Sequence, residues 1–206
     1  MEQLYLLQFQ KLEKARFLSH LDMARLFIRA FRRAKLPLKF SEGFHAHPKV
    51  RFSPPLSVGV ESCEEFCLFT LLDETRTPET LLSAISEGMA DGFLLTSLSP
   101  IEKTPTPPPK TRYEITVSCE KSSVESAFSA PMTVLKRTKA GEKEIDLFPH
   151  LTLESLTSCE SGTKLTLLAP SAEELTINPN LICTALQAKD PTIKPTRILK
   201  LCAVEH

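Results

Sequence analysis

The fold of the first half of the chain is decided by residues 19–35, which read SHLDMARLFIRAFRRAK. Ser19 followed by Asp22 has the pattern of a helix N-cap with a capping box. Apolar residues then recur at the spacing of one helix face, and Leu36-Pro37 ends the pattern because proline cannot continue a helix. The stretch therefore predicts an amphipathic helix from Ser19 to about Lys35.

The segments on either side of this helix predict an α+β fold. In chain order they are a strand over Leu4–Phe9, extended segments around Leu38–Ser41 and Val50–Phe52, a strand over Glu65–Leu72, a helix opened by Thr77-Pro78 and running through Met89, and a strand over Phe93–Leu98. Proline at the first helical position, after a threonine N-cap, is typical of a helix start. The resulting order is β-α-β-β-α-β, the split βαβ or ferredoxin-like arrangement.

A proline-rich stretch divides the chain nearly in half. Ser99–Lys110 holds five prolines in twelve residues and almost no apolar content, a composition typical of a stiff polyproline linker. We therefore expect an N-terminal domain over 1–99, a linker over 100–110 and a C-terminal domain over 111–206.

The second half is predicted to repeat the arrangement. Its expected elements are a strand over Tyr113–Val117, a helix begun by a capping box at Ser122–Glu125, a hairpin of Met132–Arg137 and Lys143–Leu147, a strand over Leu165–Leu168, a helix opened by Asn178-Pro179 and a strand over Ile198–Val204. A possible strand around Leu151–Leu156 is one more than the motif requires. The prediction is an α+β protein of two tandem ferredoxin-like (split βαβ) domains with antiparallel sheets.

The formal net charge of zero conceals two segments of opposite sign. Eleven Lys or Arg and three acidic residues lie between Lys11 and Arg51, whereas eight acidic residues and a single cation, Arg76, lie between Glu61 and Asp91. Such asymmetry favours a surface for an anionic partner. The alternative is two ordinary solvated surfaces of opposite sign.

Composition predicts a globular protein of the reduced cytoplasm. Apolar residues make up 42% of the chain, and no apolar run approaches the ~20 residues that cross a bilayer. The first residues lack a signal-peptide pattern, and the six cysteines form no CxxC pair. We therefore expect a cytoplasmic location and no membrane partner.

Four arginines share one arc of the predicted helix, about 100° wide at 100° per residue. They are Arg25, Arg29, Arg32 and Arg33. Because Asp22 is the one acidic residue on this arc, their donors remain for phosphate oxygens, which guanidinium groups bind bidentately. Arg16, Lys49 and Arg51 complete the predicted phosphate-binding set. The opposing interpretation is a solvated face paired with acids elsewhere in the chain.

A loop with two histidines follows, reading SEGFHAHPKVR over residues 41–51. His45 and His47 point to the same face of an extended chain. With His20 or Asp22 they could complete a three-ligand metal site. We expect no metal, because a histidine that hydrogen-bonds a backbone group or a phosphate is the more common case. His20 has the alternative role of a buried histidine on the apolar side of the helix.

Four stretches together resemble one bacterial family. They read RFLSHLD at 16–22, FRRAKLP at 31–37, SEGFHAHPK at 41–49 and PPLSVGVES at 54–62. They are similar to the radical SAM-linked, or radical-SAM-associated, protein family, a domain of unknown function that stands alone or is fused behind a radical S-adenosylmethionine module. The resemblance implies a recognition site made of Arg16, Ser19, His20, Asp22, Ser41, Gly43, His47, Pro48 and Lys49, with His45 beside it.

Two positions depart from the family pattern. Ala46 stands where the family usually has proline, and His45 where it often has asparagine, so His47 is favoured over His45. The chain also lacks the CxxxCxxC triad that holds a [4Fe–4S] cluster. No cofactor is therefore expected on this chain. A separate radical SAM enzyme would carry the cluster and S-adenosylmethionine.

The sequence leads to one favoured function and two alternatives. The favoured one is a non-catalytic accessory or substrate-binding protein that presents RNA (tRNA or rRNA) to the radical SAM enzyme through its basic N-terminal face, with Phe40, Phe44 and Phe52 as stacking candidates. One alternative is a histidine-dependent RNA-processing endonuclease of the tandem ferredoxin-like type, in which His20 or His47 would be the general acid or base. The other is a purely structural protein-interaction module. P-loop, GxGxxG, HExxH and GxSxG motifs are missing from the sequence, which disfavours other enzyme classes.

Overall fold

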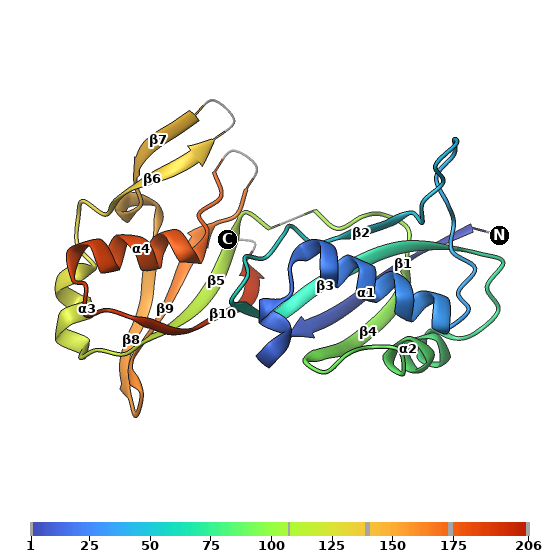
Figure 1. The fold of residues 1–206 in the computed structure, drawn as a ribbon, viewed down its shortest axis with the longest axis horizontal. Helices are drawn as coiled ribbons and strands as arrows, with labels where there is room; N and C mark the ends of the chain where they lie inside the picture. The colour runs from blue at the N-terminus through green and yellow to red at the C-terminus, as the bar shows by residue number, and fades with distance from the viewer. Residues whose placement is uncertain (1, 107, 139–140, 173–174, 205–206) are drawn as a thin grey trace. The chain divides into compact units, whose positions relative to one another are not determined.

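The structure of the protein, a computed structural model, describes residues 2–106, 108–138, 141–172 and 175–204. It has an α+β fold with mostly antiparallel strand pairing and with four α-helices in the described residues (Figure 1). The chain divides into two units, Met1–Thr106 and Pro107–His206. In the part of the chain that the structure describes, no helix is both long and apolar enough to cross a membrane.

The first unit combines a four-stranded antiparallel arrangement with two helices. Its elements are β1 (Glu2–Lys11), the 3-10 helix η1 (Glu13–Phe17), α1 (His20–Arg33), β2 (Val50–Phe52), β3 (Val60–Leu72), α2 (Pro78–Ser86) and β4 (Phe93–Ile101). The strands lie in the order β4-β1-β3, and β2 pairs with β3. Because the same stretch of β3 pairs with both β1 and β2, β2 must lie on the side of β3 away from β1.

Helix α1 forms where the sequence predicts it. The Ser19 hydroxyl accepts a hydrogen bond from the Asp22 N–H at 3.2 Å, which satisfies one of the open donors at the helix start. The apolar face of α1 packs on the sheet through two phenylalanines. Phe27 lies 4.7 Å from Phe9, and Phe31 lies 4.7 Å from Phe69, between ring centroids. Burial of this face holds the opposite, arginine-bearing face in solvent.

The short strand β2 separates two faces of the first unit. Val50 and Phe52 pack against the apolar core beneath α1, whereas Arg51 between them is exposed. Side chains alternate along a strand, so Arg51 belongs to the sheet face opposite the helices. The predicted extended segment at Leu38–Ser41 makes only isolated bridges, Leu38 to Leu71 and Phe40 to Pro48.

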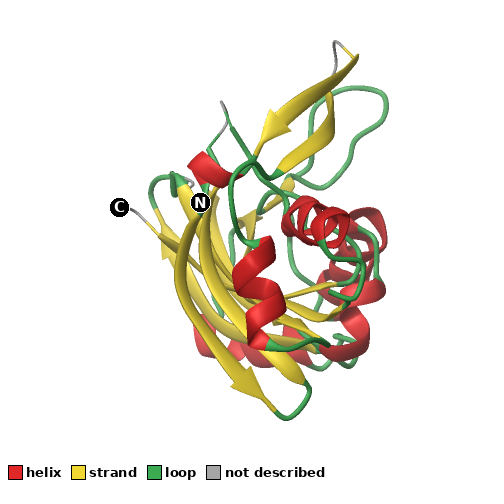
Figure 2. Cartoon of the chain, turned by 90° about the vertical axis from the view of Figure 1, so that its left-hand side faces the viewer, coloured by secondary structure: helices red, strands yellow, loops and turns green. Residues whose placement is uncertain are grey.

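The second unit combines four strands of a main sheet and a separate two-stranded hairpin with two α-helices. Its elements are β5 (Lys110–Val117), α3 (Lys121–Ala127), β6 (Thr133–Thr138), β7 (Gly141–Asp146), the 3-10 helix η2 (Phe148–His150), β8 (Thr152–Cys159), β9 (Gly162–Pro170), α4 (Pro179–Lys189) and β10 (Pro195–Val204). Within this unit the strand order is β10-β5-β9-β8. Buried residues of the strands and of α4 form its interior, among them Ile115, Leu165, Ile182 and Leu186. Figure 2 shows the chain after a 90° turn about the vertical axis, with helices in red and strands in yellow.

In the second unit, the predicted hairpin lies outside the main sheet, and the strand that the motif did not require lies within it. The predicted hairpin exists as β6 and β7, but it forms a separate two-stranded sheet. The strand expected around Leu151–Leu156 is β8, which pairs with β9 in the main sheet. The physical reason is burial: Glu142, Lys143 and Glu144 of β7 are all exposed, so this strand offers no apolar face to the main sheet.

Two further sequence predictions are corrected by the structure. Pro100 and Ile101 belong to β4 and Lys110 to β5, so the connection is shorter than the predicted linker 100–110. Pro100 is compatible with β4 because β4 pairs only with β1 in the described sheet, and an edge strand tolerates a residue without an N–H. The helix expected to begin at Ser122 instead has Glu120 as N-cap and makes no side-chain cap hydrogen bond there.

Candidate functional site

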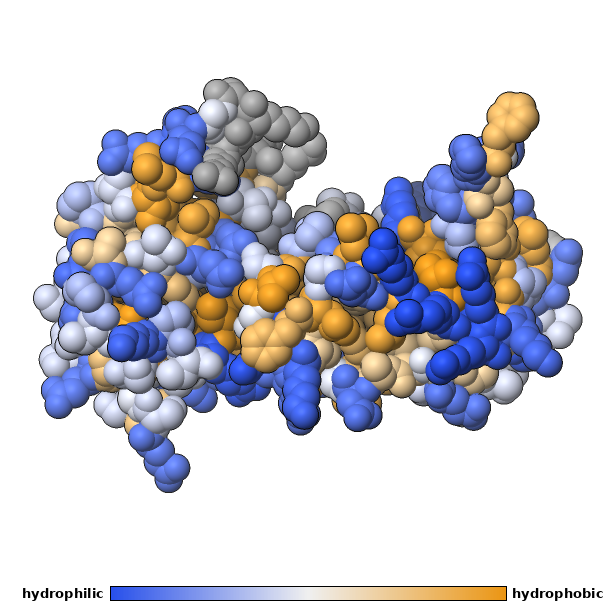
Figure 3. Space-filling model, in the orientation of Figure 1, coloured by the Kyte–Doolittle hydropathy of each residue, from blue (hydrophilic) through white to orange (hydrophobic). Residues whose placement is uncertain are grey.

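The exposed face of α1 carries the four predicted arginines. Figure 3 shows a strongly hydrophilic patch where α1 lies at the surface. Arg25 forms a loose ion pair with Asp22 at 3.6 Å, and 73% of its side chain is exposed. Arg29, Arg32 and Arg33 are exposed as well, and within the described residues they make no ion pair. We call these last three residues the α1 arginines.

Three carboxylates of the acidic segment that follows in sequence are bound to groups other than the α1 arginines. Glu74 binds Arg76 at 2.6 Å, and this hydrogen-bonded ion pair lowers the pKa of Glu74 to about 2. Glu61 is buried next to Arg16, at 3.3 Å. Glu65 is buried against the Ser62 and Ser53 hydroxyls. The sequence allowed the α1 arginines to pair with acidic residues elsewhere in the chain. They form no ion pair with these three carboxylates.

Arg16 differs from the other predicted phosphate ligands. Its guanidinium donates to the buried Glu61 carboxylate and lies 4.8 Å from the centre of the Phe17 ring. Only 28% of its side chain is exposed. Glu61 also accepts a hydrogen bond from the Glu13 N–H at 2.9 Å. Arg16 is thus committed to holding η1 on β3, and its role in the structure is internal.

A buried lysine fixes the turn that leads into α1. The Lys11 ammonium donates to the carbonyl oxygen of Leu18 at 2.9 Å, directly before the N-cap residue Ser19. Lys11 is almost wholly inaccessible, and burial lowers its pKa. Within the turn, Ser19 donates to a carboxylate oxygen of Asp22 at 2.7 Å. Ser19 and Asp22 therefore act as the helix cap.

His20 lies apart from the two loop histidines. Its ring meets the edge of Phe52 at 5.9 Å and 84°, on the side where Phe52 packs against the core. Among the described residues, no three His, Cys, Asp or Glu side chains are grouped so as to hold a metal ion. The three-ligand arrangement of His45 and His47 with His20 or Asp22 is therefore not assembled. Since β2 side chains alternate, His20 and Arg51 belong to opposite faces of the sheet.

The histidine loop is a narrow projection, which we call the arm and define as residues 39–49 (Figure 1). Its two sides are joined by main-chain hydrogen bonds of 2.8 Å, from the Lys49 N–H to Lys39 and from the Ser41 N–H to His47. The Ser41 hydroxyl also accepts from the His47 N–H at 3.1 Å. Gly43, near the tip, has φ +110°, a conformation that L-residues rarely adopt.

A groove lies at the base of the arm, on the sheet face opposite the helices. Its volume is about 450 Å³, and its lining residues are Leu4, Ser41, His47, Pro48, Lys49, Val50, Arg51, Leu68, Thr70 and Thr104. Arg51 donates to the Thr104 hydroxyl at 3.2 Å. Nδ1 of His47 lies 3.1 Å from the Ser41 hydroxyl, which orients the ring. This arm groove therefore combines apolar side chains with two basic side chains and one imidazole ring.

Several residues of the arm groove were not identified from the sequence. Leu4, Leu68, Thr70 and Thr104 come from other segments of the chain and have no motif around them. Strand alternation gives a partial signal, because Leu4 and Leu68 precede the core residues Tyr5 and Phe69 and therefore face the other way. Their proximity to Lys49 and Arg51 depends on strand pairing, which the sequence alone does not fix.

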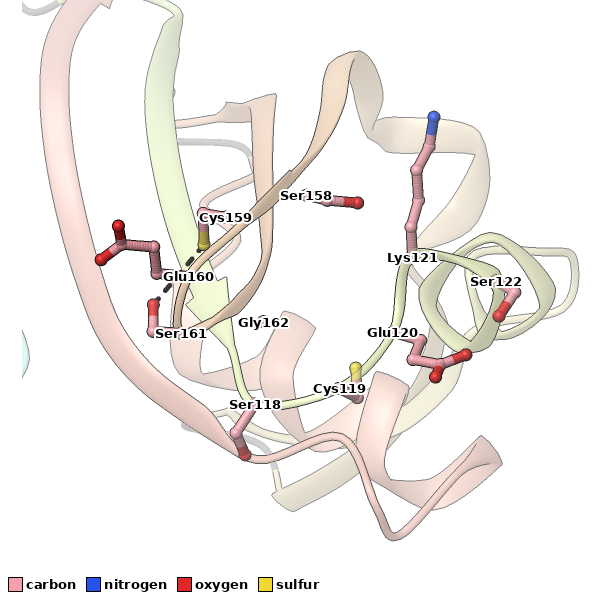
Figure 4. A pocket seen from close by; sticks show the side chains of 10 residues that line it. All are labelled: Ser118, Cys119, Glu120, Lys121, Ser122, Ser158, Cys159, Glu160, Ser161 and Gly162. Atoms are coloured by element: carbon pink, nitrogen blue, oxygen red, sulfur yellow. Dashed lines mark hydrogen bonds between the residues drawn. The ribbon is translucent and has the colours of Figure 1, made fainter.

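The second unit has a shallow hollow of about 670 Å³ between the β8–β9 turn and the segment that leads into α3 (Figure 4). Its lining includes Cys119 and Cys159, and Cys159 lies 3.5 Å from the Ser161 hydroxyl. Burial raises the pKa of the Cys119 thiol, which disfavours the reactive thiolate. None of the lining residues is a histidine. The hollow therefore offers no histidine as the adjacent base that would activate a cysteine nucleophile.

The fold defines the class as an α+β protein of two units with mostly antiparallel strand pairing. The chain belongs to the family described as "Uncharacterized protein conserved in bacteria (DUF2344)", which matches residues 5–179. No curated protein matches the chain. Two solved structures are similar over nearly their whole length. One is an unknown protein from Galdieria sulphuraria, with 12% identity and a TM-score of 0.29 over 98% of this chain and 100% of that one. The other is a putative glycine cleavage system transcriptional repressor, with 10% identity and a TM-score of 0.25 over 97% and 99%.

Proposed function

We propose that the protein is a non-catalytic accessory or substrate-binding protein that binds RNA, of the tRNA or rRNA class, through its first unit. The observation that carries this proposal is the set of three exposed α1 arginines without an ion pair among the described residues. Guanidinium groups without an ion pair can bind phosphate oxygens bidentately, and three of them share one helix face here. Three carboxylates of the acidic segment 61–91 are engaged in other contacts, as in the Glu74–Arg76 pair.

We further propose that each unit has the ferredoxin-like arrangement. The support is the strand order, β4-β1-β3-β2 in the first unit and β10-β5-β9-β8 in the second. In both cases the last strand of the unit lies beside the first, and helices follow the first and third of the four strands. The hairpin β6–β7 is an insertion between α3 and β8. Sheets of this kind commonly present RNA-binding surfaces, an argument by analogy of fold.

The proposed partner is a separate radical SAM enzyme, which would supply the [4Fe–4S] cluster and S-adenosylmethionine. The support is the sequence resemblance over residues 1–75 and the absence of a CxxxCxxC triad from the sequence. A cytoplasmic location is part of the same proposal, and all six cysteines are thiols, as that compartment favours. A purified RNA-modifying enzyme of this class should act faster on its RNA when the protein is present.

RNA binding is tested by titrating tRNA with the purified protein across a salt series. We compare the wild type with the variant Arg29→Gln/Arg32→Gln/Arg33→Gln. A matched control, Lys121→Gln/Lys143→Gln/Lys194→Gln, removes the same charge from exposed positions of the second unit. The wild-type affinity should fall with salt at a log–log slope of roughly −0.7 to −0.9 per phosphate contact.

The arginine variant should bind more weakly and with a slope shallower by about 2 to 3, whereas the control should retain the wild-type slope. Intact RNA after the titration supports a non-catalytic role, and cleaved RNA would support the endonuclease alternative. Wild-type protein without salt-sensitive binding would overturn the proposal.

A further inference from the structure

One aromatic residue of the arm has no packing role. Phe44 has a relative exposure of 107%, so its ring stands wholly in solvent at the arm tip. The other two stacking candidates are different. Phe52 packs against Phe27, at 5.3 Å and 80°, and Phe40 is only 46% exposed. Of the three candidates, Phe44 alone offers both faces of its ring to a ligand.

The arm presents this ring on an ordered support. Main-chain hydrogen bonds join its two sides at Lys39–Lys49 and Ser41–His47, and the Ser41 side chain adds a third contact to the His47 N–H. A short loop whose two sides are joined by hydrogen bonds loses less conformational entropy on binding than a flexible one. The exposed ring is therefore positioned for a partner that stacks on it.

Cationic groups lie on the same segment as the ring. Lys49 at the arm base and Arg51 two residues further line the arm groove together with His47. Both Lys49 and Arg51 are exposed, and the Arg51 guanidinium donates a hydrogen bond to the neutral hydroxyl of Thr104. An exposed aromatic ring and a basic groove on one segment are the two features by which proteins hold single-stranded nucleic acid, through base stacking and backbone contacts.

We propose that the arm binds a single-stranded segment of RNA. An unpaired base stacks on Phe44 at the arm tip, while phosphates further along the same strand enter the arm groove and contact Lys49, Arg51 and His47. This inference rests on the proposed function, because it takes RNA as the ligand, and it adds that the recognised segment is unpaired. A base within a duplex is stacked on its neighbours and does not offer its face to the ring.

Tryptophan fluorescence gives a direct test, because the sequence contains no tryptophan. The variant Phe44→Trp places a single indole at the arm tip, where the exposed position tolerates the larger ring. We titrate it with a single-stranded oligoribonucleotide and with a duplex of the same sequence. Phe17→Trp is the matched control, since Phe17 is also exposed, at 60%, but lies on η1.

Stacking predicts that the single strand quenches the fluorescence of Phe44→Trp, that the duplex quenches it much less, and that Phe17→Trp responds to neither. In parallel, Phe44→Ala should weaken single-strand binding by roughly 5- to 150-fold with an unchanged salt slope, whereas Phe44→Tyr should bind like the wild type. Lys49→Gln/Arg51→Gln should make the salt slope shallower by about 1 to 2.

Two kinds of failure can be separated. If the wild type shows no salt-sensitive RNA binding, the proposed function itself fails. If the wild type binds RNA but Phe44→Ala binds equally tightly, or Phe44→Trp is not quenched, the α1 arginines remain the binding surface and the stacking role of the arm is wrong. Equal quenching by single strand and duplex would also overturn the preference for unpaired RNA.

Discussion

Nη1 of Arg76 donates a hydrogen bond to the main-chain carbonyl oxygen of Ala34 at 2.9 Å. Ala34 is the C-cap of α1, where the last carbonyl groups of the helix have no partner within it. A second nitrogen of Arg76 contacts the Lys35 carbonyl at 3.3 Å, and the guanidinium is itself held by Glu74. The helix end that carries Arg32 and Arg33 is thus fixed by a loop from beyond β3.

Replacing Arg76 by methionine should therefore destabilise the first unit. The change removes the cap of α1 and leaves the Glu74 carboxylate, only 6% exposed, without its cation. We expect the free energy of unfolding to fall by about 1–3 kcal/mol, as measured by urea denaturation. Lys35→Ala, at a neighbouring exposed position, should change it by less than about 0.5 kcal/mol. Equal effects of the two variants would contradict the role given to Arg76.

The Glu74–Arg76 pair also predicts an acid-sensitive contribution to stability. The guanidinium hydrogen bonds lower the pKa of Glu74 from 4.5 to about 2 in the folded protein. A lowered pKa means that the unfolded state binds the proton more readily, so the stabilisation is present above pH 4.5 and is lost as the pH falls towards 2. Urea midpoints measured over this range should decline less in Glu74→Gln than in the wild type.

The core under α1 depends on one phenylalanine more than on its neighbours. The Phe27 ring lies within 4.7–6.1 Å of the rings of Phe9, Phe31, Phe52 and Phe93. Phe27→Ala would leave a cavity at the centre of this cluster, at a cost of about 3–5 kcal/mol in the free energy of unfolding. Phe17→Ala is the comparison, because that ring is exposed. A small effect of Phe27→Ala would show that the cluster can close the cavity.

Removal of the Ser41 hydroxyl should loosen the arm without unfolding the unit. Ser41→Ala deletes the acceptor of the His47 N–H and the group that faces Nδ1 of the same histidine, both at 3.1 Å. The loss of such bonds, worth about 0.5–1.5 kcal/mol, corresponds to amide exchange at His47 that is roughly 2- to 10-fold faster. Hydrogen–deuterium exchange measures this effect, and Ser122→Ala in the second unit should leave the arm unchanged.

Two glycines with positive φ should respond differently to alanine. A Cβ at Gly162, which has φ +127°, would lie 2.1 Å from the Val117 carbonyl oxygen, whereas a Cβ at Gly43, φ +110°, would meet nothing within 4 Å. Gly162→Ala combines backbone strain with a main-chain clash, so its destabilisation should exceed the ~1–3 kcal/mol expected of strain alone at Gly43→Ala. Thermal unfolding of the two variants checks the order.

The helix α1, its cap at Ser19 and its arginine face follow from the sequence alone. Each is a local property: the cap and the first turn are three residues apart, and the 3.6-residue period places the arginines on one side and Phe27 and Phe31 on the other. The β6–β7 hairpin is local in the same sense, because only two residues of the chain separate its two strands. The sequence determined these elements because neighbours along the chain supply their decisive contacts.

The tertiary structure decided which of these elements work together. Arg16 forms an ion pair with the buried Glu61, and His20 packs against Phe52, away from His47. Leu4 and Thr104 line the same groove as Lys49 and Arg51. The tertiary structure also selected β8, and excluded the hairpin, as the partner of β9. These outcomes depend on strand register and on competition for buried positions between residues distant in sequence, which no local pattern encodes.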